Sequence, residues 1–490
     1  MNLSKSKYCN AIQCKKILWL AKNKPEVMTK TDNESIMETG NAVHEVARYL
    51  FGSHINIEYT DNLSQMIKDT YSTIESYKNV IITEASFEYQ NNFCSVDILK
   101  KENDNYEIYE VKSSTELKDV YLNDASYQYY VLTNLGLKVT KCSIVIINSE
   151  YERIGEIDLN KLFIKSDITA DVISLQPTVK KNLIEINEYL GNSTEPTEEL
   201  DTKCFKPYNC PFFEYCSRHL PHPNVFDISV TPGLRGLKYY QQGYHTFEDL
   251  LTAKINDKQR QIIEYALSDK PDYIDREKIS EFLSSLTYPL YFLDFETYQM
   301  AIPLYDRVKP YEQIPFQYSL HYIEKENGPL LHKEFLAEAG GDPRRKLALQ
   351  LVDDIPKNVT VLAYNMSFEK ARIKRLAEIY PNLKDHLMNI YNNLKDLEDP
   401  FSKRYYYTKS MGASSSIKKV LPALFPNDPE LDYHNLDLIQ NGTDAMNSFK
   451  MMENMDKDEL TYTRERLLKY CELDTYAMVK ILDKLKEVTK

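Results

Sequence analysis

The stretch YFLDFETYQ, residues 291–299, constrains the fold of this chain more than any other feature. Its aromatic and aliphatic residues are typical of a buried strand, and Asp294 and Glu296 stand two positions apart within it. Side chains of a strand alternate between its faces, so both carboxylates point to the same face. Two neighbouring like charges repel, and burial of either is costly. The stretch therefore predicts a buried strand whose charges are offset by a bound cation or a basic partner.

The 490 residues predict two α/β domains joined by a helical connector. Residues 1–220 begin and end with cysteines, residues 221–283 are polar and helical in pattern, and residues 284–490 begin just before the quoted strand. Within the connector, residues 232–251 weakly resemble a helix-hairpin-helix motif. Further elements are predicted as helices over 38–51, 123–136, 367–380 and 459–490, and as strands over 85–101, 105–116, 141–151 and 358–365.

Charge and hydropathy limit the classes of partner. The net charge of −13 argues against a generally basic nucleic-acid-binding coat, although it allows a local basic groove. No apolar run approaches the ~20 residues of a membrane span. The N-terminus lacks the long apolar stretch of a signal peptide. We therefore expect a soluble, cytoplasmic protein that does not contact membranes; its protein partners are left open.

Asp97, Glu110 and Lys112 form the first candidate site. Asp97 follows an apolar run, and a turn at residues 101–105 predicts a hairpin that brings it close to Glu110. Glu110 and Lys112 share a strand face. Two carboxylates can hold Mg²⁺ or Mn²⁺, which polarises a phosphate, while Lys112 orients or helps deprotonate the attacking water. Without a metal, the same pattern is the solvated face of an ordinary strand.

The spacing D97-x12-E110-x-K112, with Gln128 in the next helix, resembles the PD-(D/E)XK nucleases, and within them the RecB-like branch that includes CRISPR-associated adaptation nucleases. Gly40 to His44 matches the upstream G-x-x-x-H motif of that branch. The resemblance implies a restriction-endonuclease-like fold. It implies metal ligation by His44, Asp97 and Glu110, with the Val111 carbonyl as a further ligand. Lys112 would then be catalytic, and Gln128 would position the substrate or the lysine.

Eight cysteines include three at close spacing, Cys204, Cys210 and Cys216. In a cytosolic chain, clustered cysteines indicate a metal before a disulfide. A four-ligand site needs one more thiol, for which Cys14 is the candidate and Cys9 the rival. The RecB-like branch often carries one N-terminal and three C-terminal cysteines around a [4Fe-4S] cluster, and AIQCKKILWL resembles its opening motif. Zn²⁺ and unliganded thiols are the alternatives; the other cysteines are predicted core thiols.

Carboxylates in the third region predict a second site. Asp294 and Glu296 come from the quoted strand, and Glu369 follows another strand at the start of a helix. Tyr470 and Asp474 are four apart on the last helix and therefore share a face. Four carboxylates and a tyrosine can surround two metal ions, which activate water and stabilise the leaving oxygen of a phosphodiester. A bound cation is thus the expected answer to the repulsion within residues 291–299, and ordinary surface carboxylates are the alternative.

The set D-x-E and Y-x-x-x-D resembles the DEDD exonucleases of the ribonuclease-H-like fold, in the subclass that carries a tyrosine. Asp294, Glu296 and Asp474 would bind metal, and Tyr470 would orient the attacking water. The second motif of the family has an aspartate where this chain has Glu369 after Phe368, so Asp396 is a further acidic residue that could assist or replace it. Residues 410–424 offer serines and lysines before a helix, either to bind a nucleic-acid backbone or as a capped surface helix.

Nearly the whole chain resembles an uncharacterised bacterial family that fuses a RecB-like domain to a DEDD-like domain. The strings YPLYFLDFET and SIKKVLPALFP carry that resemblance. The expectation is a bifunctional nuclease that cleaves single strands or ends of DNA and also trims 3′ ends. One alternative is a nucleic-acid-binding scaffold with one or both sites inactive, which the Glu369 departure favours. Another is an RNA-processing exonuclease.

Overall fold

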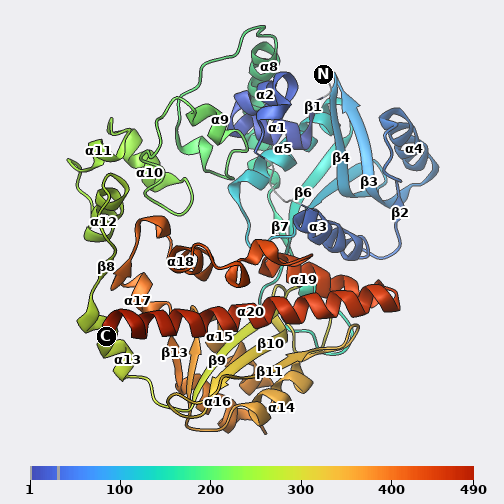
Figure 1. Cartoon of the computed structure of the whole chain (residues 1–490). Helices are drawn as coiled ribbons and strands as arrows, with labels where there is room; N and C mark the ends of the chain where they lie inside the picture. The colour runs from blue at the N-terminus through green and yellow to red at the C-terminus, as the bar shows by residue number, and fades with distance from the viewer. Residues whose placement is uncertain (1–2, 30–33) are drawn as a thin grey trace. The chain divides into compact units, whose positions relative to one another are not determined.

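The computed structural model describes residues 3–29 and 34–490. The chain divides into two compact units, Met1–Leu220 with Met300–Tyr311, and Pro221–Gln299 with Glu312–Lys490. Residues 300–311 interrupt the second unit in sequence but pack in the first. Arg153 of the first unit holds them there, because its Nη1 donates to the carbonyls of Pro303 (3.0 Å) and Leu304 (2.6 Å). Each unit contains a β-sheet with helices packed on it, so the predicted α/β class is confirmed (Figure 1).

The first unit is built on a seven-stranded sheet of order β2-β3-β4-β5-β6-β7, with β1 paired to β4. Its strands are β1 (Leu3–Ser4), β2 (Ile55–Asn56), β3 (Asn79–Tyr89), β4 (Asn92–Glu102), β5 (Asn105–Val111), β6 (Lys138–Ile147) and β7 (Phe163–Asp167). Strands β3, β4 and β5 form an antiparallel meander. Helix α5 (Asp119–Asn134) then crosses over, so that β6 runs parallel to β5. This crossover places the helix that carries Gln128 beside the strand that carries Glu110.

The prediction of one strand over residues 85–101 is wrong, because a tight turn divides it. Strand β3 ends at Tyr89 and β4 begins at Asn92. The two residues between them, Gln90 (φ 49°) and Asn91 (φ 62°), both have left-handed backbone, as two-residue hairpin turns of right-twisted strands require. The predicted turn after residue 101 is confirmed, since β4 ends at Glu102 and β5 begins at Asn105. Asp97 therefore lies on the middle strand of the meander.

Helices cover both faces of this sheet. They are α1 (Lys5–Gln13), α2 (Lys15–Asn23), α3 (Glu34–Ala47), α4 (Leu63–Ser76), α5, α6 (Leu159–Leu162), α7 (Thr169–Ser174), α8 (Gln176–Leu190) and α9 (Phe213–Ser217), with short 3-10 turns η1 (Pro25–Val27) and η2 (Thr202–Cys204). Tyr127 and Val131 of α5 pack with Val96 and Ile108 in one core. Val43 and Ala47 of α3 pack in a second core that includes Ile98, Tyr109 and Val111. The alternate residues of β4 and β5 thus face different helices.

The main sheet of the second unit has the order β11-β10-β9-β12-β13. Its strands are β9 (Leu290–Tyr298), β10 (Ile314–Ile323), β11 (Leu331–Leu336), β12 (Thr360–Ala363) and β13 (Leu394–Asp396), and β8 (Tyr273–Ile274) pairs separately with β14 (Tyr406–Tyr407). Strands β9, β10 and β11 are antiparallel, whereas β12 and β13 run parallel to β9. The strand predicted from residues 291–299 is therefore central in its sheet.

Strand β9 has two differently covered faces. Tyr291, Leu293 and Phe295 are buried in the core formed with α14 (Arg344–Asp354), α15 (Ser367–Ile379) and α16 (Lys384–Asn392). On the opposite face the long helix α20 (Lys457–Thr489) runs across β9, β10 and β11 (Figure 1). Asp294 and Glu296 alternate with the core residues and therefore lie on the α20 face, as the period of two predicts.

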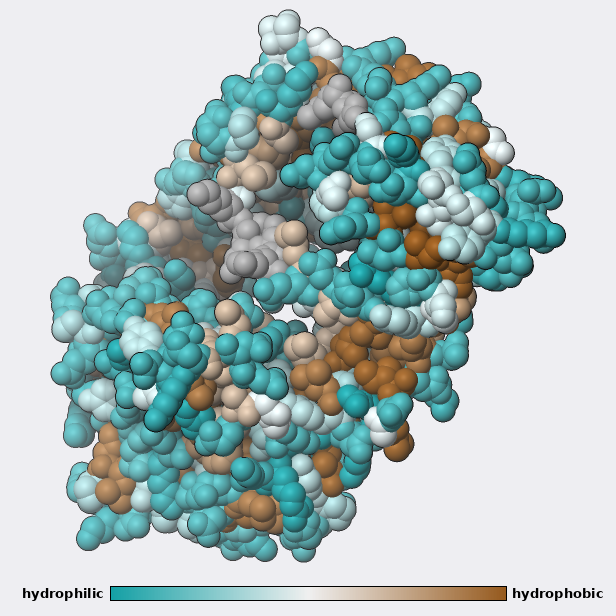
Figure 2. Space-filling view, turned by 90° about the vertical axis from the view of Figure 1, so that its right-hand side faces the viewer, coloured by the Kyte–Doolittle hydropathy of each residue, from teal (hydrophilic) through white to brown (hydrophobic). Residues whose placement is uncertain are grey.

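The remaining elements of the second unit are helical, and residues 221–283 are part of this unit. They are α10 (Leu234–Tyr240), α11 (Phe247–Leu250), α12 (Asp257–Ala266), α13 (Arg276–Ser284), α17 (Asp399–Ser402), α18 (Ile417–Leu424) and α19 (Gly442–Met451), with 3-10 turns η3 (Lys409–Met411), η4 (Pro429–Leu431), η5 (Tyr433–Asn435) and η6 (Met452–Asn454). Among the described residues, no helix combines the length and apolar character needed to cross a membrane. Figure 2 shows a surface on which hydrophilic residues predominate and apolar residues form separate patches.

Candidate functional site

The first unit brings the sequence-predicted carboxylates Asp97 and Glu110 together. Ile98 of β4 pairs with Tyr109 of β5, so Asp97 and Glu110 come next along the ladder. Both are buried, at 5% and 1% exposure. The backbone N–H of Val111 donates to Asp97 Oδ2 at 2.7 Å. This bond fixes the Asp97 carboxylate where β5 ends.

Lys5, which the sequence reasoning missed, joins these two carboxylates. Its Nζ lies 3.0 Å from Asp97 Oδ1 and donates to Glu110 Oε1 at 3.0 Å and Oε2 at 3.1 Å. Lys5 is the first residue of α1, a helix that follows β1 beside β4. Burial alone would raise the pKa of Asp97, but Lys5 and then His44 outweigh it and hold the pKa below its ordinary value. The first site therefore has basic partners for its charge.

Lys112 and Gln128 lie where the sequence predicts, and Asp124 completes their contacts. Lys112 Nζ donates to Glu110 Oε1 at 2.6 Å and to Asp124 Oδ2 at 2.5 Å. Gln128 Nε2 donates to Glu110 Oε2 at 2.6 Å and to Asp124 Oδ1 at 3.2 Å. Burial opposes the charged form of Lys112, but Glu110 and Asp124 prevail and raise its pKa. Lys112 is therefore an ammonium group that can orient a ligand or donate a proton, whereas proton abstraction by it is disfavoured here.

His44 approaches the same pair from α3. Its Nε2 lies 3.9 Å from Asp97 Oδ2. Together with Glu84, which the sequence reasoning missed, these two residues offer three ligand atoms within 4.8 Å of one another. Glu84 lies in β3 at a break in the pairing and has a φ of 58°, which turns it out of the regular alternation. The two carboxylates are suitable donors for Mn²⁺ or Mg²⁺, and the imidazole offers a third ligand atom.

A cavity opens onto Lys112 and Asp124 in this unit. Tyr121, Tyr208 and Tyr311 also line it. Aromatic rings beside an ammonium group can accept stacked bases while the lysine holds a phosphate. The cavity gives the first site an opening for a ligand.

Replacing Lys5 with methionine is expected to lower the stability of the protein in EDTA by about 1–3 kcal/mol, the cost of leaving buried acceptors of Asp97 and Glu110 without a donor. Thermal unfolding with and without EDTA measures the effect. Lys22, exposed on α2, provides the control Lys22→Met, which should behave as wild type. Equal unfolding temperatures for Lys5→Met and Lys22→Met would contradict the role assigned to Lys5.

The four candidate cluster cysteines surround one small cavity. Cys14 lies between α1 and α2, Cys204 closes η2, Cys210 follows in a loop, and Cys216 lies in α9; all four line the cavity. Gln13 Nε2 ties the two ends together by donating to the carbonyls of Lys203 (2.8 Å) and Tyr208 (2.7 Å).

Cys9 lies elsewhere, on the cavity that contains Lys112. Of the two rival fourth cysteines, Cys14 is thus the one beside the other three. Burial raises the pKa of Cys204 to about 11 and that of Cys210 to about 12. Sulfur ligation requires the thiolate form, so a bound metal would have to displace these protons. The donor set suits zinc or an iron–sulfur cluster.

The second unit gathers the other predicted carboxylates between β9 and α20. Asp294, Glu296 and Asp474 each offer an oxygen within 4.8 Å of the other two. Cys471 Sγ lies 3.8 Å from Asp294 Oδ2. Burial, and then the charge of Asp474, raises the pKa of Asp294 and raises that of Glu296 to about 8. Burial also raises the pKa of Asp474 to about 6. We call these three residues with Glu369 the acidic centre.

Glu369, in the first turn of α15, is buried at 2% exposure, and its Oε2 has no hydrogen-bond partner. Its charge adds to the repulsion felt by Asp294 and Glu296. Burial raises its own pKa to about 8. Asp396, the alternative, instead accepts the backbone N–H groups of Asn365 (3.0 Å) and Met366 (3.1 Å). Glu369 is thus the fourth carboxylate with an available oxygen.

Two aromatic residues and a lysine border the acidic centre. Tyr433 Oη donates to Asp474 Oδ1 at 2.6 Å, a contact the sequence reasoning missed. Lys418 Nζ lies over the rings of Tyr433 (5.3 Å) and Tyr470 (5.4 Å). Lys418 belongs to the stretch 410–424, and with Tyr433 it lines a hollow beside the centre. Burial, then Asp474, raises the pKa of Tyr470, so its hydroxyl keeps its proton.

The acidic centre differs from the first site in its charge balance. Within residues 3–29 and 34–490, no lysine or arginine forms an ion pair with any of its four carboxylates. Lys418 only moderates the pKa values of Glu296 and Asp474 from beyond ion-pair distance. Three buried carboxyl groups and the half-buried Asp294, with no ion-pair partner among the described residues, form a donor set for hard divalent cations. Of the two partners expected for the charges of residues 291–299, a basic ion-pair partner is not found among the described residues, and a bound cation stays a prediction.

Comparison with known proteins gives relatives whose activity is not described. A family model described as "Domain of unknown function (DUF2779)" matches residues 291–416, which include Asp294, Glu296 and Glu369 but not Asp474. The chain is 27% identical over 216 residues to the uncharacterized protein MG366 of Mycoplasma genitalium, covering 41% of this chain and 32% of that protein. It is 26% identical over 232 residues to the homologue in Mycoplasma pneumoniae, covering 44% and 35%. The chain spans about a third of the length of these curated relatives.

Proposed function

We propose that this chain is a metal-dependent nuclease with two sites for phosphodiester hydrolysis, one in each unit. The observation that carries the proposal is the acidic centre, with three buried carboxyl groups, the half-buried Asp294, and no ion-pair partner among the described residues. The strand order β11-β10-β9-β12-β13 supports it, because three antiparallel strands followed by two parallel ones is the order of the ribonuclease-H-like fold that the motifs resemble.

In the second unit, Asp294, Glu296, Glu369 and Asp474 would hold Mg²⁺ or Mn²⁺. When bound, the metal would supply Lewis-acid polarisation of the phosphodiester and a more acidic water. Tyr470 retains its proton and can orient that water by donating a hydrogen bond. Lys418 faces the hollow beside the centre and can hold a substrate phosphate. We propose 3′-5′ trimming of DNA here, with RNA as the alternative substrate.

In the first unit, His44, Glu84, Asp97 and Glu110 are the proposed metal donors. Lys112 would position the scissile phosphate as a cation, and Gln128 and Asp124 would hold Lys112 in place. The order of α3, the meander β3-β4-β5, α5 and β6 supports the resemblance to PD-(D/E)XK nucleases. The cysteine cavity would hold a [4Fe-4S] cluster, with Zn²⁺ as the alternative, and would tie Cys14 to residues 204–216.

A binding role without cleavage is the alternative for the first unit alone. Lys5 occupies the space between Asp97 and Glu110 and satisfies both carboxylates without a metal. A unit in that state would bind DNA in the cavity beside Lys112 and leave it intact. Cleavage products from the first unit would distinguish catalysis from binding alone.

A cleavage assay tests the proposal. It uses protein purified without oxygen, Mn²⁺ or Mg²⁺, and single-stranded DNA labelled separately at each end. Lys112→Ala should lose the first unit's products, because it removes the cation that positions the phosphate. Asp294→Asn should lose the 3′ trimming, because it removes a metal donor; each loss should be about 10²-fold or more. Lys138→Ala, an exposed lysine on β6, is the control. Unchanged products in Lys112→Ala would leave the binding role for the first unit. RNA replaces DNA in a second series.

A further inference from the structure

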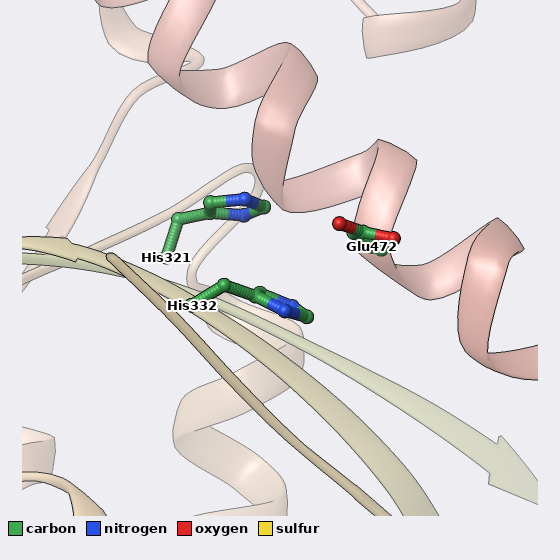
Figure 3. Close-up of side chains that lie close together, drawn as sticks. All are labelled: His321, His332 and Glu472. Carbon is green, nitrogen blue, oxygen red and sulfur yellow. The ribbon is translucent and has the colours of Figure 1, made fainter. Parts of the chain in front are cut away.

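A cluster of metal-ligating side chains lies beside the acidic centre but shares no residue with it. His321 comes from β10, His332 from β11 and Glu472 from α20 (Figure 3). One ligand atom of each lies within 4.8 Å of the other two. His321 and His332 are directly paired across the two antiparallel strands, which brings their rings to a centroid distance of 4.4 Å. Glu472 faces the two rings from the helix (Figure 3).

A chain of hydroxyl groups orients both imidazole rings. His321 Nδ1 lies 2.8 Å from Thr475 Oγ1, and His332 Nε2 lies 2.9 Å from Ser319 Oγ. The two hydroxyls are 2.7 Å apart, and Thr475 donates to the carbonyl of Glu472 at 3.1 Å. A carbonyl only accepts, so with Thr475 donating there Ser319 donates to Thr475, and each histidine donates one N–H to a hydroxyl. These bonds hold the rings from behind.

The same bonds leave one lone pair free on each ring. With Nδ1 of His321 and Nε2 of His332 as donors, the remaining nitrogens, His321 Nε2 and His332 Nδ1, are unprotonated acceptors. Metal-binding histidines commonly have this arrangement, in which the second ring nitrogen donates to an oxygen that fixes tautomer and orientation. In the described part of the chain, no lysine or arginine forms an ion pair with Glu472, so its carboxylate is available.

We propose that His321, His332 and Glu472 bind a divalent cation of the zinc class. Two imidazoles and one carboxylate favour zinc over magnesium, which prefers an all-oxygen shell. The chemistry thus separates this cluster from the acidic centre. The site would tie β10 and β11 to α20, the helix that also carries Tyr470 and Asp474. Its role would be structural, and the inference stands whether or not the acidic centre cuts nucleic acid.

The amount of Zn²⁺ bound to the full-length protein tests this site. It is measured by dialysis against a series of free Zn²⁺ concentrations, followed by elemental analysis. The wild type should bind one equivalent more than His332→Ala. Glu472→Gln should weaken that equivalent at least about tenfold, and because Glu472 is exposed the variant should fold normally. Ser319→Ala keeps all three ligands but should weaken the same equivalent about 10–100-fold, the range for loss of an outer-shell partner. His434→Ala, at an exposed histidine paired with Asp432, is the matched control.

The cysteine cavity contributes equally in all variants, so only the difference in stoichiometry counts. Equal Zn²⁺ binding by wild type, His332→Ala and Glu472→Gln would overturn the site and leave two neighbouring, hydroxyl-bonded histidines with tilted rings. Retained binding in Ser319→Ala would overturn the positioning role of the hydroxyl chain. Because nuclease activity is not the readout, failure of this site and failure of the proposed function are distinguishable.

Discussion

Asp294→Asn is expected to stabilise the metal-free protein while it abolishes 3′ trimming. Asp294 is half-buried beside Asp474 and Glu296; loss of solvent, and then repulsion from these two carboxylates, raises its pKa. The isosteric amide removes one charge and keeps the packing. In EDTA the melting temperature should rise by about 2 °C or more, whereas cleavage should fall by about 10²-fold or more. A substitution that stabilises a protein and inactivates it is the expected behaviour of a strained functional site.

The pH dependence of stability tests the acidic centre without a measurement of nuclease activity. Burial raises the pKa of Glu296 and of Glu369 to about 8 and that of Asp474 to about 6. These carboxyl groups therefore bind more protons in the folded protein than in the unfolded chain, so the stability that they contribute in EDTA falls as the pH rises through the range from about 4.5 to about 8. Mn²⁺ should reverse this fall, because it binds the ionised carboxylates. Asp294→Asn should show a shallower fall and less stabilisation by Mn²⁺.

Asp483→Asn is the matched control, since Asp483 lies exposed on α20. It should leave trimming, the melting temperature and the pH profile unchanged. Two results would contradict the assignment of the acidic centre. One is an Asp294→Asn protein that trims as wild type, and the other is one that melts lower than wild type in EDTA.

Local patterns predicted the elements that carry the sites. The alternation of residues 291–299 correctly placed Asp294 and Glu296 on one face of a strand, because the period of two is a property of the strand itself. The turn between β3 and β4 was missed because its two residues, Gln90 and Asn91, lie within a longer stretch in which polar residues also occur on both sides of the turn. A two-residue hairpin leaves too little turn signal to separate two strands from one.

The site residues that were not predicted from the sequence lie far along the chain from their partners or in irregular backbone. Lys5 lies 92 residues from Asp97, and a lysine in a helix carries no pattern that points to a partner. Glu84 becomes available because a break in the pairing of β3 turns it out of register. Tyr433 reaches Asp474 from a 3-10 turn. Asp124 alone had a usable signal, since it precedes Gln128 by one helical turn on the same face.

Cys204→Ser is expected to remove the metal proposed for the cysteine cavity and to destabilise the first unit severely. Cys204 lines the same small cavity as Cys14, Cys210 and Cys216, and these four come from both ends of the unit's sequence. A metal that joins residue 14 to residues 204–216 closes a loop of nearly the whole unit, so its loss restores much of the unfolded chain's freedom. The protein should lose bound metal, become less soluble and unfold at a lower temperature.

Cys9→Ser separates the cluster from the general effect of losing a thiol. Cys9 lies on the Lys112 cavity and not among the four cysteines, so this variant should keep its metal content. Elemental analysis and the visible spectrum of protein purified without oxygen distinguish iron with acid-labile sulfide from zinc. Metal content that is equal in Cys204→Ser and wild type would refute the cluster. A loss in Cys9→Ser, with retention in a Cys14→Ser variant, would instead make Cys9 the fourth ligand and require a rearrangement of α1, because α1 now places Cys9 beside Lys112 and Cys14 beside Cys204.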